Sequence, residues 1–111
     1  MNKIYFSEQG KPVARQIGNT LFKRVRGSVH QLRQPPSWAI DEKILQEAIS
    51  NGVNMVEIFD VETRKIYRVS IDYFTKSGIR LNRGFGLQVA LPLNYWTVSR
   101  QDIRQLKLEL L

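Results

Sequence analysis

Two stretches of this chain contain basic side chains and no acidic ones. Residues 9–40 carry six Lys or Arg residues without an Asp or Glu, and residues 73–99 carry three. Guanidinium and ammonium groups pair with phosphate oxygens, and these contacts give a salt-dependent affinity for polyanions. The formal net charge of +7 also favours a polyanionic partner. We therefore predict phosphate contacts by seven side chains: Arg15, Lys23, Arg24, Arg26, Arg33, Arg80 and Arg83.

The run Lys23-Arg24-Val25-Arg26 has two interpretations. It can form a phosphate-binding patch, with the neighbouring Phe22 stacking on a nucleobase. It can equally be a solvated strand edge, where charged side chains prevent edge-to-edge aggregation. His30, the single histidine, has no acid near it in sequence to orient it as a general base, so we expect a hydrogen-bonded structural role.

The acidic side chains concentrate between the basic stretches, in residues 41–72. A metal-dependent nuclease would need several carboxylates to converge on one point. Glu57 lies in an apolar run, whereas Asp60 and Glu62 lie where a turn is expected. Glu57 is expected at the rim of the sheet or paired with Arg68 across a hairpin. The chain has no cysteine, which excludes zinc sites of the Cys or Cys/His type, and we predict no cofactor.

Three aromatic residues, Trp38, Tyr95 and Trp96, occur near prolines or in expected loops. Such residues act as core plugs or as anchors of protein interfaces. A leucine-rich helix is expected after Ser99 and Asp102, and its end can pack on the sheet or on a second copy of the chain. These features favour an alternative function in protein interaction or assembly, including a homodimer.

Arg83-Gly84-Phe85-Gly86 resembles the start of the octapeptide of the RNA-recognition motif, where an aromatic side chain on a central strand stacks on a base. Ile4-Tyr5-Phe6 is similar to the other aromatic strand of that family. The resemblance implies base stacking by Phe85. Leu87 and Ala90 replace residues that are usually aromatic in the family. The alternative is a bulge or turn, in which the two glycines let the backbone bend and Phe85 packs inward.

These side chains must be positioned by a single α+β domain covering residues 1–111. We predict an antiparallel sheet of about five strands, packed by a central helix and a C-terminal helix. Apolar runs and period-two alternation predict strand structure in the following segments: residues 3–6, 13–17, 20–25, 55–61, 66–73, 79–81 and 86–91.

The central helix is expected over residues 41–51. Asp41 should cap its first turn, and Gly52 should take the left-handed conformation after its last turn. The segment 66–73 has a competing interpretation, in which Ser70 caps a short helix over residues 71–77.

Taken together, these patterns predict a small, non-enzymatic, basic nucleic-acid-binding protein. The alternatives are a protein-interaction module and, third, a metal-dependent nuclease. No apolar run approaches the roughly 20 residues that span a bilayer, and the first residues lack the apolar run of a signal peptide. We therefore expect no membrane partner and a cytoplasmic location.

Overall fold

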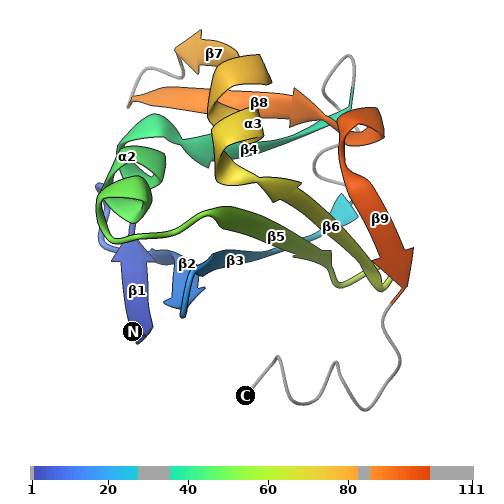
Figure 1. The fold of residues 1–111 in the computed structure, drawn as a ribbon, viewed down its shortest axis with the longest axis horizontal. Coiled ribbons are helices and arrows are strands. Elements are labelled where there is room, and N and C mark those ends of the chain that lie inside the picture. The colour runs from blue at the N-terminus through green and yellow to red at the C-terminus, as the bar shows by residue number, and fades with distance from the viewer. Residues whose placement is uncertain (1, 28–35, 83–85, 101–111) are drawn as a thin grey trace.

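The computed structural model describes residues 2–27, 36–82 and 86–100. In this part of the chain, nine strands form two sheets, and two α-helices lie beside them (Figure 1). In chain order the elements are β1 (Asn2–Phe6), β2 (Pro12–Ile17), β3 (Thr20–Val25), β4 (Ser37–Asp41), α2 (Glu42–Ser50), β5 (Met55–Asp60), β6 (Lys65–Ser70), α3 (Ile71–Ser77), β7 (Ile79–Asn82), β8 (Leu87–Pro92), the 3₁₀ turn η1 (Leu93–Tyr95) and β9 (Thr97–Arg100).

The larger sheet, sheet A, has six strands in the order β1-β2-β3-β5-β6-β9. β3 and β5 are parallel, and the other neighbouring pairs are antiparallel. The parallel pair arises because β4 and α2 connect β3 to β5, so the chain re-enters sheet A in the same direction. The prediction of one purely antiparallel sheet is therefore wrong, although β5 is a central strand as expected.

The smaller sheet, sheet B, has the antiparallel order β4-β8-β7. No strand was predicted over the segment that forms β4. Its first four residues, Ser37 to Ile40, are all buried. A strand that is buried on both faces shows no alternation of apolar and polar residues, which is why the pattern did not reveal it.

Between them, the two helices contact both sheets. α2 contacts β4 and β8, while α3 contacts β5, β6, β8 and α2. In Figure 1, α3 lies across β8, and α2 lies beside β4. Each helix buries a short apolar stripe, formed by Ile44, Leu45 and Ala48 in α2 and by Ile71 and Phe74 in α3. The main core therefore lies between the inner face of sheet A, the helices and sheet B.

The predicted helix ends are confirmed in part. Gly52 has a φ of 85° and follows α2, as expected. Ser70 caps α3, because its Oγ accepts a hydrogen bond from the Tyr73 N–H at 3.1 Å. Asp41 occupies the N-cap position of α2 but makes no side-chain cap hydrogen bond. Its Oδ1 instead accepts from Nε2 of Gln88, its partner residue on β8, at 3.2 Å.

An aromatic cluster fills the core. Trp38 lies edge-on to Tyr67 with ring centroids 5.1 Å apart, and Trp96 lies edge-on to Phe74 at 5.4 Å. Trp38 and Trp96 are only 1% and 5% exposed. The indole Nε1 of Trp96 donates to the Leu91 carbonyl at 3.1 Å. Both tryptophans therefore have the first of the two roles expected for them, as core plugs, and of the three aromatic residues only Tyr95 is exposed.

A buried polar network ties the β1–β2 hairpin to the end of α2. The Tyr5 hydroxyl donates to Oε1 of Gln16 at 2.6 Å and accepts from Nδ2 of Asn51 at 3.0 Å. Nε2 of Gln16 donates to the carbonyl oxygens of Gly18 and Asn51. Because these buried polar groups satisfy one another, the hairpin is held in a defined position on the helix.

Ser99, where the C-terminal helix was expected to begin, lies instead in β9. Residues 101–111, on which the rest of that prediction falls, are outside the described part of the chain. None of the helices in the described ranges is sufficiently long and apolar to span a membrane.

Candidate functional site

The side of sheet A that points away from the helices carries both apolar and charged side chains. Successive residues of a strand point to opposite faces, so strand register assigns each residue to one side. The side opposite the main core, here called the outer face, comprises Ile4, Phe6, Arg15, Ile17, Phe22, Arg24, Glu57, Phe59, Ile66 and Arg68.

Strand register places five of these residues in one row across the sheet. Arg15 lies between Ile4 on β1 and Phe22 on β3. Phe22 faces Glu57 on β5, and Glu57 faces Arg68 on β6. Neighbouring strands lie about 4.8 Å apart, so consecutive members of the row are in contact range.

The second row of the outer face begins with Arg24 on β3. Arg24 lies opposite Phe59, which lies opposite Ile66. Phe59 and Ile66 form a small buried cluster that is separate from the main core. Arg24 is two residues beyond Phe22 on the same strand, so Phe22 has an arginine on the adjacent strand and another on its own strand.

A hollow of about 450 Å³ lies on this face, and its lining includes Ile4, Arg15, Phe22, Arg24 and Glu57. Three apolar side chains beside or at the hollow are exposed: Ile4 45%, Phe6 57% and Ile17 45%. Contiguous exposed apolar surface of this kind commonly marks an interaction site.

The charge of the outer face is mainly positive. Arg15, Arg24 and Arg68 contribute three positive charges and Glu57 contributes one negative charge. The side chain of Glu57 is 11% exposed, and its Oε1 lies 3.5 Å from Nε of Arg68. This ion pair confirms the expected pairing across the β5–β6 hairpin.

The structure brings together only some of the predicted phosphate-contacting residues. Arg15 and Arg24 share the outer face. Lys23 points to the other side of β3, where its Nζ donates to the Ala39 carbonyl of β4 at 2.9 Å. Arg80 belongs to sheet B and donates to Oε1 of Glu42 at 2.9 Å. Arg26 is exposed after the end of β3.

The remaining predicted residues, Arg33, His30 and Arg83, lie outside the described part of the chain, as does Phe85 of the octapeptide-like segment.

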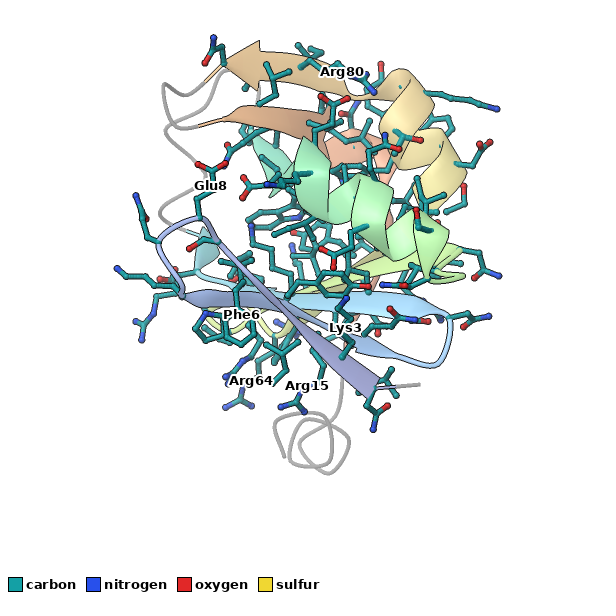
Figure 2. The ribbon with its side chains drawn as sticks, turned by 90° about the vertical axis from the view of Figure 1, so that its left-hand side faces the viewer. Lys3, Phe6, Glu8, Arg15, Arg64 and Arg80 are labelled. Carbon is teal, nitrogen blue, oxygen red and sulfur yellow. The ribbon has the colours of Figure 1, made fainter. Side chains whose placement is uncertain are left out.

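Two arginines that sequence reasoning did not assign to the site also belong to this side of the molecule. Arg68 ends the first row, and Arg64 lies in the β5–β6 turn with a φ of 61°. Figure 2 shows Arg64, Arg15 and Phe6 on the outer side of sheet A, with Arg80 at the opposite end of the molecule. Ile4 and Phe6 alternate with the buried Tyr5 in β1, and this alternation is the sequence pattern that places both side chains on the outer face.

The carboxylates considered for a metal site do not converge. Asp60 is buried, and its Oδ1 accepts hydrogen bonds from the N–H groups of Gly27 and Glu62, each at 3.0 Å. Asp60 therefore fixes the ends of β3 and β5. Within the described ranges, no three His, Asp or Glu side chains are grouped closely enough to hold a metal ion.

Comparison of the chain with protein-family models, with curated proteins and with solved structures finds no significant match.

Proposed function

We propose that this protein is a small, non-enzymatic nucleic-acid-binding protein that uses the outer face of sheet A. The observation that carries the proposal is the combination, around one hollow, of Arg15 and Arg24 with the aromatic ring of Phe22. Guanidinium groups pair with phosphates, whereas aromatic rings stack on bases. A nucleic acid offers both kinds of group along one chain, so it is complementary to this surface.

The distribution of charge supports the same proposal. Arg15 and Arg24 are exposed. Arg68, whose ion pair with Glu57 lies on the same face, adds a third guanidinium at the other end of the row. Lys23 and Arg80 are not expected to contribute, because each makes a contact elsewhere in the fold. A cytoplasmic location remains part of the proposal.

A protein-interaction or assembly function is the second candidate, and the exposure of Ile4, Phe6 and Ile17 favours it. An apolar partner, such as a second copy of the chain, would cover these side chains. Trp38 and Trp96 no longer support this function, because they are buried. The two candidates differ in their response to salt, since apolar association does not depend on the release of counterions.

The test is fluorescence anisotropy with a labelled oligonucleotide of mixed sequence at several salt concentrations. We expect the affinity to fall steeply between about 50 and 200 mM salt. Arg15→Ala combined with Arg24→Ala should weaken binding and reduce the slope of log affinity against log salt by about 1 per arginine.

The matched control is Arg80→Ala combined with Lys76→Ala, which removes two positive charges from sheet B and α3. This control should retain most of the slope. Absence of binding at the lowest salt, or an equal loss in both double variants, would contradict the proposal. Salt-insensitive self-association, measured by analytical ultracentrifugation, would favour the second candidate.

A further inference from the structure

We propose that the outer face accepts a single strand rather than a duplex, with one base stacked on the ring of Phe22. This inference rests on the nucleic-acid-binding function proposed above and names its substrate class. Phe22 is half-buried, lines the hollow and lies in the middle of the first row. Its ring is therefore fixed by neighbouring strands while part of its surface remains open to a ligand.

The two arginines beside Phe22 define where phosphates would lie. Arg15 is its direct partner on β2, and Arg24 is two residues away on β3. These separations are about 5 Å and about 7 Å at the backbone. A nucleotide whose base stacks on Phe22 thus has its own or an adjacent phosphate within reach of a flexible guanidinium.

Glu57 determines how the bound strand is oriented on the outer face. Its carboxylate faces Phe22 across the β3–β5 pair and lines the same hollow. A carboxylate repels phosphate, so the backbone is expected over Arg15 and Arg24, with the base directed toward Glu57. A base edge carries amino and imino N–H groups that a carboxylate can accept. The charge pattern therefore favours bases, not phosphates, at the centre of the face.

A duplex fits this surface poorly. Its bases are stacked inside, and it presents phosphates and narrow grooves that admit a helix or a two-stranded ribbon. The outer face is a sheet surface of five successive strands, β1, β2, β3, β5 and β6. Against a duplex, the charged phosphates would lose water over exposed apolar groups such as Ile4 and Phe6, which offer them no hydrogen bond in return.

The experiment compares one labelled sequence as a single strand and as a duplex, using the full chain. We expect the single strand to bind at least about tenfold more tightly at equal salt. Phe22→Leu keeps an apolar side chain but removes the ring, and it should weaken single-strand binding by roughly 5- to 100-fold. Phe22→Tyr, which keeps the ring, should restore most of the affinity.

A second variant makes stacking directly visible. Phe22→Trp introduces an indole at the hollow, and we expect its fluorescence to be quenched by the single strand and not by inorganic polyphosphate. The unsubstituted protein supplies the background from the buried Trp38 and Trp96. This measurement also decides the question if Phe22→Leu does not fold, as judged by circular dichroism.

Two results would overturn the inference while leaving the proposed function intact. These are duplex binding as tight as single-strand binding, or salt-dependent binding without an effect of Phe22→Leu and without quenching in Phe22→Trp. Absence of binding to either form at low salt would instead remove the proposed function itself.

Discussion

At the scale of the residue, Tyr67 shows how the fold alters one side chain. Burial raises the pKa of its hydroxyl above the ordinary value of 10.0, and the negative charge of Asp60 raises it further. The ring lies between Trp38 and Trp96, with centroid separations of 5.1 and 6.5 Å. The folded protein therefore holds the Tyr67 proton to a higher pH than the unfolded chain does.

We predict that Tyr67 makes stability fall as pH rises above about 10. The unfolded state ionises first, so ionisation lowers its free energy relative to the folded state through the window between the two pKa values. Below that window the stabilisation is intact. Urea unfolding of the wild-type protein and of Tyr67→Phe across this range measures the difference. The Phe variant should lose less stability with pH. Parallel curves for the two proteins would show that Tyr67 does not contribute.

At the scale of the element, α3 depends on its first turn. Ser70 ends β6 and caps α3, so one residue terminates the strand and starts the helix. At the other end, Gly78 approaches Val89 and the Phe74 carbonyl so closely that a Cβ atom would collide with them. A capping serine therefore begins this seven-residue helix, and a glycine that leaves no room for a Cβ follows its last residue.

We predict that Ser70→Ala lowers the free energy of unfolding by about 0.5–2 kcal/mol, because the Tyr73 N–H loses its acceptor. Urea denaturation measures the change. Ser50→Ala at the end of α2 is the control: the Ser50 hydroxyl donates to the Gln46 carbonyl at an exposed site, so its effect should stay within about 0.5 kcal/mol. Equal losses in the two variants would argue against a specific capping contribution.

At the scale of the whole molecule, Lys23 connects the two sheets. Its Nζ donates to the backbone carbonyl of Ala39 on β4, while the neighbouring Arg24 points to the outer face. Adjacent residues of one strand thus serve different purposes: Lys23 holds sheet B against sheet A, and Arg24 is available for a ligand.

We predict that Lys23→Met destabilises the protein by about 1–3 kcal/mol, because a partly buried carbonyl loses a charged donor. In oligonucleotide binding, its slope of log affinity against log salt should match that of Lys43→Met, a control at an exposed position of α2. Thermal unfolding and anisotropy together test this division of roles. A slope reduced as much as in Arg24→Ala, or no loss of stability, would contradict it.

Part of the candidate site was accessible from the sequence. Arg15, Phe22 and Arg24 were identified from their types, and the strand over residues 20–25 was predicted with its observed limits. Alternation along that strand also separates Lys23 from Phe22 and Arg24. Arg68 could not be assigned to the first row of the outer face, because no local sequence pattern predicts that β5 lies between β3 and β6.

The sequence by itself determined the features that depend on a few neighbouring residues. These include most strands, helix α2, the cap at Ser70 and the left-handed Gly52, because alternation, capping and turn geometry act over short distances along the chain. Only the tertiary structure decided the parallel pairing of β3 with β5, the place of β4 in a second sheet, and the burial of Trp38 and Trp96. Those features depend on which distant segments exclude water from one another. A strand that is buried on both faces also shows no alternation of apolar and polar residues from which it could be predicted.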